Sequence, residues 1–209
     1  MIVLAIGAHF DDIELGCGGT IAKHISQGDE VIIFVATKSG YSNINGNKVR
    51  KDEVAATEGI QAIKALGVKK YILGNFATFE LEFNEDLNKE ILSILDKNKV
   101  DCVYTHWSGD IHHDHQALAK STLHCCRHIK KILMYRSNWY TSDKEFKGNF
   151  FVDISDFWQT KKAAIECHVS ELERTSKRWI TFWLHEAENE GLRIGTKYAE
   201  VFEVVKWIA

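Results

Sequence analysis

Two short polar segments hold the residues of this chain that are best suited to chemistry. They are residues 9–12 (HFDD) and residues 110–115 (DIHHDH), and each follows a strongly apolar run. Imidazole and carboxylate groups in this mixture suit a catalytic Zn²⁺ that keeps one coordination position open. An extra carboxylate beside the ligands could serve as general base for a metal-activated water. A metal-dependent hydrolase is therefore the leading hypothesis from these residues alone.

The residue types in the two segments permit a division of roles. Two of His9, Asp11 and Asp12 can bind the metal while the third faces the attacking water. His115 would be the third ligand, which leaves His112 to face the reacting carbonyl group. Three protein ligands leave a position for water and substrate oxygen, and the remaining carboxylate can take a proton during attack.

The elements that must position these segments alternate along the chain. Apolar runs predict strands, and segments of helical spacing follow them. Strands are expected over residues 2–8, 30–37, 70–73, 100–105, 131–136, 150–154 and 197–205. Helices are expected over residues 20–27, 50–66, 86–98, 115–127, 156–168 and 171–185. This alternation predicts a mostly parallel sheet covered on both faces, with the active site beyond the carboxyl ends of the strands. We expect residues 1–209 to form a single domain.

Composition argues against a nucleic-acid-binding, a disulfide-rich or a membrane-spanning protein. The net charge of −3 argues against nucleic acid as the main partner. The five cysteines are scattered without a Cys-x-x-Cys pair, which favours buried thiols in a reducing compartment. No run approaches the ~20 apolar residues of a membrane span, and the first residues lack the basic start of a signal peptide. We therefore expect a cytoplasmic protein without stable membrane insertion.

A glycine-rich segment follows the first polar segment. Gly16, Gly18 and Gly19 resemble a loop that cradles phosphate before a helix. The spacing is not Gly-x-Gly-x-x-Gly, and no Gly-Lys-Ser/Thr follows. Close packing of a helix start is the favoured interpretation, with an approaching phosphate or nucleotide as the alternative.

Several residues are candidates for substrate contact. The long loops at residues 38–48 and 137–148 could form substrate walls, because such loops often carry specificity. Trp107, Trp139 and Tyr140 lie near predicted strand ends, where they could stack on a sugar face or simply pack.

The two polar segments resemble the motifs of the PIG-L/LmbE-like N-deacetylases. Residues 9–20 (HFDDIELGCGGT) resemble the family's Ala-His-Pro-Asp-Asp-Glu signature, and residues 112–115 (HHDH) resemble its His-Pro-Asp-His motif. Weaker matches extend over most of the chain, at residues 50–53, 151–155, 162–168 with Ser170, and 198–202.

The resemblance implies a fold and an activity. The family has a Rossmann-like α/β fold, which here means a three-layer sandwich with a mostly parallel sheet. It removes acyl groups, typically acetyl, from N-acylated amino sugars and their conjugates. Carried over, His9, Asp12 and His115 would bind one Zn²⁺, and Fe²⁺ or Co²⁺ are the alternative metals.

The resemblance also assigns roles to the remaining polar residues. Asp11 would be the general base, and His112 would stabilise the charged intermediate or protonate the leaving amine, with Asp114 orienting His112. Phe10 and His113 stand where the family has prolines. We expect some loss of loop rigidity, because proline restricts φ, and His113 offers a competing imidazole.

The sequence thus predicts a zinc-dependent N-deacetylase acting on an amino-sugar derivative, such as an N-acetylglucosamine conjugate or a nucleotide-linked sugar. Arg50, Arg136, Gly18 and Gly19 are the predicted substrate-binding residues, although Arg136 could equally be a surface arginine. The alternatives are a metal-dependent amidase on a non-sugar N-acyl compound and a non-catalytic sugar- or nucleotide-binding protein. An intact Asp11 argues against the last, because binding alone needs no base. Homo-oligomerisation is left open.

Overall fold

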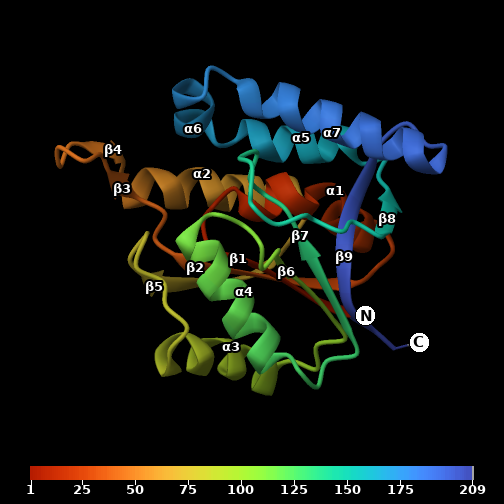
Figure 1. Ribbon diagram of the computed structural model, residues 1–209, viewed down its shortest axis with the longest axis horizontal. Coiled ribbons are helices and arrows are strands. Elements are labelled where there is room, and N and C mark those ends of the chain that lie inside the picture. The colour runs from red at the N-terminus through yellow and green to blue at the C-terminus, as the bar shows by residue number, and fades with distance from the viewer. Residues whose placement is uncertain (209) are drawn as a thin grey trace.

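A central seven-stranded sheet dominates the computed structural model, which describes residues 1–208 (Figure 1). Its strands are β1 (Ile2–Gly7), β2 (Glu30–Thr37), β5 (Lys70–Phe76), β6 (Cys102–His106), β7 (Lys131–Tyr135), β8 (Phe150–Asp153) and β9 (Ala199–Trp207). Their order across the sheet is β5-β2-β1-β6-β7-β9-β8. The strands from β5 to β7 pair in parallel, and β9 runs antiparallel to both of its neighbours. The predicted mostly parallel sheet is confirmed.

Helices cover both faces of the sheet (Figure 1). The helices are α1 (Asp12–Ser26), α2 (Asp52–Ala65), α3 (Glu85–Lys97), α4 (His113–Cys125), α5 (Trp158–Glu166), α6 (Val169–Arg174) and α7 (Arg178–Ile194). Side chains alternate between the two faces of a strand. Val3 and Ala5 of β1 accordingly pack with α1 and α2, whereas Leu4 and Ile6 pack with α3 and α4. Two covered faces explain why the central strands are continuously apolar.

The strand order brings the two polar segments together. From β1 the chain proceeds through β2 to β5 at one edge, then returns to place β6 on the other side of β1. Strands β1 and β6 are therefore direct parallel neighbours, with Val3 opposite Cys102 and Ala5 opposite Tyr104. A reversal of strand order of this kind opens a crevice at the carboxyl ends of the strands. The segments that follow β1 and β6 meet at that crevice.

Helix α1 differs from its prediction. It begins at Asp12, directly after the first polar segment, whereas the sequence predicted a helix from residue 20. Glycine is a poor helix former, but packing against other elements overrides that preference here. An added Cβ at Gly16 would collide with Tyr135, and one at Gly19 would lie 2.7 Å from Ile154. The glycines therefore belong to a helix that packs closely on its neighbours.

The structure corrects the predicted secondary structure of two other segments. The predicted loop at residues 38–48 contains the start of a small hairpin, formed by β3 (Tyr41–Ser42) and β4 (Lys48–Arg50). The predicted helix at residues 171–185 is interrupted between α6 and α7, where Ser176 and Lys177 have φ of 51° and 58°. Left-handed backbone of this kind cannot continue a helix. Within residues 1–208, no helix combines the length and the apolar character needed to cross a membrane.

Candidate active site

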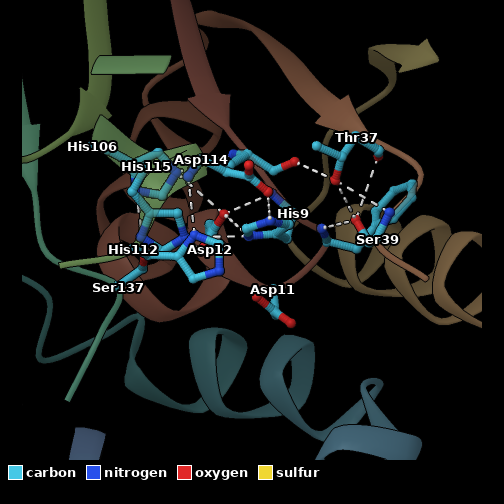
Figure 2. A network of polar contacts seen from close by, with 12 residues as sticks. His9, Asp11, Asp12, Thr37, Ser39, His106, His112, Asp114, His115 and Ser137 are labelled. Carbon is cyan, nitrogen blue, oxygen red and sulfur yellow. Dashed lines mark hydrogen bonds and ion pairs between the residues drawn. The ribbon is translucent and has the colours of Figure 1, made fainter. Parts of the chain in front are cut away.

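Three side chains from separate elements converge at the crevice between β1 and β6. His9 follows β1, Asp12 opens α1, and His115 lies in the first turn of α4. Nε2 of His115 lies 3.2 Å from Nδ1 of His9 and 3.1 Å from Oδ1 of Asp12. Nδ1 of His9 lies 3.4 Å from Oδ2 of Asp12. Figure 2 shows these groups pointing toward one another.

Each of the two histidines is held from behind by a carboxylate. Oδ2 of Asp114 lies 2.8 Å from Nε2 of His9, and Oδ2 of Asp110 lies 3.1 Å from Nδ1 of His115. Carboxylates in this position fix the tautomer and orientation of a metal-binding imidazole. The inner nitrogens of both rings are thereby left to face Asp12.

The carboxylate of Asp114 contacts His9 rather than His112. Its carboxylate accepts hydrogen bonds from the backbone N–H groups of Phe79 and Leu81, at 2.7 Å and 3.1 Å, besides its contact with His9. The role predicted for Asp114, orienting His112, falls to its backbone N–H, which donates to Nδ1 of His112 at 3.2 Å, whereas its carboxylate orients His9. The reason is the strand order, which places His9 beside the first turn of α4.

The donor atoms fit a divalent metal. Two imidazole nitrogens and one carboxylate are ligands that suit Zn²⁺ and leave a position for substrate. Burial opposes protonation of both rings, but their contacts with carboxylates raise the pKa of His9 to about 9 and that of His115 to about 10. Burial favours the neutral form of Asp12, yet the neighbouring His115 and His106 hold its pKa well below the usual value. A metal cation that binds here would displace the protons that His9 and His115 carry beside the Asp12 carboxylate.

Asp11 points away from the three converging groups (Figure 2). Its φ is 120°, a left-handed value that is costly for a residue other than glycine. Strained backbone of this kind is often found at functional sites, and here it turns Asp11 away from Asp12. Burial, and then the charge of Asp12, raise the pKa of Asp11 to about 7, against the opposing effect of Arg50. A carboxylate with such a pKa is suited to accept a proton near neutral pH.

A buried network supports Asp11. Nη1 of Arg50 lies 3.4 Å from Oδ2 of Asp11, and its Nη2 donates to Oε2 of Glu58 at 2.9 Å. Glu58 in turn accepts from the backbone N–H and the hydroxyl of Ser170, at 2.8 Å and 2.6 Å. Nη2 of Arg50 also lies 3.3 Å from Nδ1 of the buried His168. Although Arg50 borders the cavity, its side chain is engaged with these protein groups.

His112 supplies a neutral ring at the same site. Its Nδ1 accepts a hydrogen bond of 3.2 Å from the backbone N–H of Asp114, which leaves the proton on Nε2. Burial, and then the charges of His115 and His9, lower the pKa of His112 to about 4. The ring stacks on His115 with centroids 4.5 Å apart. His112 can therefore donate a hydrogen bond from Nε2 at neutral pH.

His106 is part of the site, although the sequence analysis assigned it no role. It is fully buried at the end of β6, stacks on His115 at 3.9 Å, and lies 3.2 Å from Oδ2 of Asp12. Its Nε2 accepts from the backbone N–H of Ala8 at 3.0 Å, so its lone pair is directed at the backbone rather than at a metal. Ser137 donates to Oδ1 of Asp12 at 2.9 Å. The sequence feature that could have identified His106 as a site residue is its position at the carboxyl end of a strand next to β1.

His9, Asp11, Asp12, His112 and His115 line one cavity of about 270 Å³. Both loops that were predicted as substrate walls, after β2 and β7, contribute residues to its lining, and further lining residues come from the segment after β5 and from α6 and α7. The lining includes His9, Asp11, Asp12, Tyr41, Arg50, Phe79, His112, His115, Asn138, Trp139, Tyr140, Arg174, Trp179 and Trp183. The cavity thus combines a cluster of groups that could hold a metal with several aromatic side chains.

The structure does not bring Gly18 and Gly19 to this cavity. Both are buried inside α1, and the backbone N–H groups of Gly19 and Thr20 donate to Glu200 at 2.9 Å and 2.7 Å. Glu200 also accepts from Nζ of the buried Lys161 at 2.6 Å. The prediction that the glycines bind substrate is therefore wrong, because Glu200 occupies the donors that a phosphate would need.

Arg136 and His113 also lie outside the cavity lining. Arg136 pairs with Glu186 at 2.8 Å on the far side of the segment that follows β7. His113 is the first residue of α4 and does not border the cavity, so it is not placed to compete with His115.

Phe10 fixes the first polar segment in place, although it stands where the family motif has a proline. Its backbone N–H donates to Oγ of Ser39 at 2.9 Å, a bond that proline could not make. The Phe10 ring is buried against Gly59 of α2, where an added Cβ would collide with it. Packing and one hydrogen bond thus oppose the loss of rigidity expected from the missing proline.

The chain is similar in sequence and in fold to known deacetylases. Residues 4–126, which include both polar segments, match the family model described as PIG-L, GlcNAc-PI de-N-acetylase. YaiS of Escherichia coli, named an uncharacterized deacetylase, is 34% identical over 179 residues, covering 80% of this chain and 90% of the relative. Diacetylchitobiose deacetylase of Thermococcus kodakarensis is 27% identical over 230 residues, covering 99% of this chain and 84% of the relative. The structure of N,N'-diacetylchitobiose deacetylase from Pyrococcus horikoshii, with its inhibitor MPG, matches with a TM-score of 0.84 at 25% identity, covering 98% of this chain and 83% of that chain.

Proposed function

The chain belongs to the PIG-L family of GlcNAc-PI de-N-acetylases, and we propose that it is a zinc-dependent N-deacetylase of an acetylated amino sugar. One observation carries the proposal. His9, Asp12 and His115 converge within 3.4 Å of one another beside Asp11, in a cavity with aromatic walls. A protein that only bound sugar would need neither these ligands nor a strained carboxylate next to them.

His9, Asp12 and His115 would hold the metal, and their nitrogen and oxygen donors suit zinc. Fe²⁺ and Co²⁺ are the alternatives, because affinity and availability both decide the occupant. When bound, the metal would supply Lewis acidity, which polarises the amide carbonyl and favours ionisation of water. The carboxylates of Asp110 and Asp114 would keep the two histidines oriented.

The remaining side chains perform the proton transfers. Asp11 accepts a proton as the water oxygen attacks the carbonyl carbon, and this transfer typically contributes about 10²–10⁴ in rate. His112 donates a hydrogen bond from Nε2 to oxygen that gains negative charge as the carbon becomes tetrahedral. The C–N bond then breaks, the amine nitrogen receives the proton carried by Asp11, and acetate and a free amino sugar are released.

The cavity wall supports a sugar as the substrate. Trp139, Tyr140 and Trp179 present rings whose apolar faces suit the C–H faces of a pyranose. Ser39 and Asn138 lie in the same wall, and each of them also bonds a neighbouring protein group. Relatives named for diacetylchitobiose are consistent with this substrate class.

The test pairs metal analysis with acetate release from N-acetylglucosamine and its conjugates, comparing the wild type with Asp11→Asn. We expect one metal per chain in both proteins and a loss of about 10²–10⁴ in kcat in the variant. Absence of bound metal after zinc is supplied would overturn the proposal. Bound metal with turnover of N-acyl amino acids but of no sugar would instead identify an amidase of another substrate class.

A further inference from the structure

Phe79 combines a strained backbone with an exposed aromatic ring. Its φ is 70°, a left-handed value that is unusual for a bulky residue, and it is 53% exposed. The carboxylate of Asp114 holds this backbone, because it accepts hydrogen bonds from the N–H groups of Phe79 and Leu81. Strain of this kind persists where the surroundings impose it, and it is concentrated at functional sites. Since a half-exposed ring gains little from core packing, its fixed position points to a role in the cavity.

The ring of Phe79 lies beside His112 and Tyr41 at the edge of the cavity. It stacks on His112 with centroids 5.4 Å apart and 24° between the planes, and it meets Tyr41 edge to face at 5.8 Å. The hydroxyl of Tyr41 donates to Glu171 at 2.9 Å and is therefore already engaged by the protein. Tyr41 and Phe79 thus form an apolar corner next to His112, and both residues border the cavity.

A second apolar wall lies on the other side of the site. It consists of cavity-lining residues that pack in or against one apolar cluster, namely Leu15, Trp139, Trp179 and Trp183. Trp139 follows β7, and α7 packs on β9, whereas the apolar corner comes from the segments after β2 and β5. Strand β1, which carries His9 at its end, separates these two groups of strands in the sheet. The metal-binding groups therefore lie between two apolar surfaces.

An N-acylated sugar has two apolar parts that must point in opposite directions. The amide group is planar and trans, so the acyl carbon chain and the sugar carbon lie at opposite ends of it. If the sugar packs on the wall formed by Trp139 and Trp179, with the carbonyl oxygen at His112, the acyl group points toward the apolar corner. A methyl group needs little room there, whereas a longer chain would meet the ring of Phe79.

We propose that Phe79 determines which acyl group is removed: with Tyr41 it accepts the methyl group of acetyl and excludes longer chains. The hydrogen bond from its backbone to Asp114 makes the exclusion effective, because a ring that could turn aside would admit those chains. Phe79 is thus a specificity-determining residue of the proposed deacetylase, and the inference rests on that proposed function.

The experiment measures kcat/KM of the metal-loaded protein for N-acetyl-, N-propanoyl- and N-butanoylglucosamine. Phe79→Ala removes the ring, and Phe79→Trp replaces it with a larger one. Phe83→Ala is the matched control, because Phe83 is 40% exposed and does not border the cavity. Metal content and thermal unfolding of each variant check that the fold and the metal site persist.

In the wild type, each added methylene should lower kcat/KM by about 10- to 200-fold, the usual effect of one methylene in an apolar pocket. Phe79→Ala should raise the ratio of kcat/KM for propanoyl over acetyl by about tenfold, and Phe79→Trp should lower it. Phe83→Ala should leave the ratio unchanged.

Two results would overturn this assignment of Phe79. The first is a common loss of kcat/KM for all three substrates in Phe79→Ala with an unchanged ratio, which is what a merely structural role predicts. The second is equal turnover of the acetyl and butanoyl substrates by the wild type. Failure of the wild type to release acetate from any N-acetylated sugar would instead refute the proposed function, and this inference with it.

Discussion

Oδ2 of Asp114 lies 2.8 Å from Nε2 of His9, so a carboxylate of the second polar segment holds a histidine of the first. The backbone N–H groups of Phe79 and Leu81 fix that carboxylate from the other side. Asp110 has the equivalent contact with His115. Of the two candidate metal-binding histidines, His9 is thus supported across the two segments, whereas His115 is supported from within its own segment.

Asp114→Asn should weaken metal binding about 10- to 100-fold, the usual effect of losing a group that orients a ligand. The amide cannot provide the charged acceptor that His9 now has. Competition with a chelator of known affinity measures the change. Asp96→Asn, at an exposed site on α3, is the control. An unchanged affinity in Asp114→Asn would show that Asp114 does not hold His9 in solution.

Metal binding should stabilise the protein more as the pH rises from 6.5 to about 9. The pKa of His9 is raised from 6.5 to about 9, and that of His115 to about 10. Groups with raised pKa stabilise the metal-free fold below pH 6.5 and lose that contribution as the pH rises through the folded-state values. Below those values a metal must also displace protons, which weakens its binding.

Thermal unfolding with and without buffered zinc, across this pH range, measures that trend. The difference in Tm should grow with pH, and a buffer-dependent heat of binding should reveal the released protons. A difference in Tm that is independent of pH would contradict protonated His9 and His115 in the metal-free protein.

Glu58→Gln should lower kcat by up to about a hundredfold with little change in KM, because Glu58 positions Arg50 against Asp11 and does not itself border the cavity. Loss of hydrogen bonds to a charged group should also cost about 1.5–3 kcal/mol in the free energy of unfolding. Steady-state kinetics and denaturant unfolding separate the two effects. If Glu58→Gln and the wild type have equal specific activity per folded molecule, Glu58 has a purely structural role.

Gly18→Ala and Gly19→Ala form a matched pair within α1. An added Cβ at Gly18 meets its nearest atoms at 3.5 Å, an ordinary contact, so alanine should gain about 0.5–1 kcal/mol from helix propensity. At Gly19 the Cβ would lie 2.7 Å from Ile154, and overpacking should cost about 1–3 kcal/mol.

Chemical denaturation measures both changes, and substrate affinity should be unaffected in either variant. A rise in KM without a change in stability would restore the phosphate-binding interpretation of these glycines.

The amino-acid sequence by itself determined the parallel sheet and the two polar segments at its carboxyl edge. Continuous apolar runs are a local signal of strands buried on both faces, and histidine with aspartate is a local signal of metal-binding chemistry. Those signals also sufficed to select His9, Asp11, Asp12 and His115 as the central group of residues.

Other features of the site were decided by contacts between distant elements. The partner of Asp114, the role of His106 and the support of Asp11 by Arg50 and Glu58 all depend on which strands and helices are neighbours. Local propensity misplaced the start of α1, because its glycines fit against Tyr135 and Ile154, which come from later in the chain. Spacing along a sequence cannot report such contacts, since the free energy that selects them comes from packing and charge pairing in the folded state.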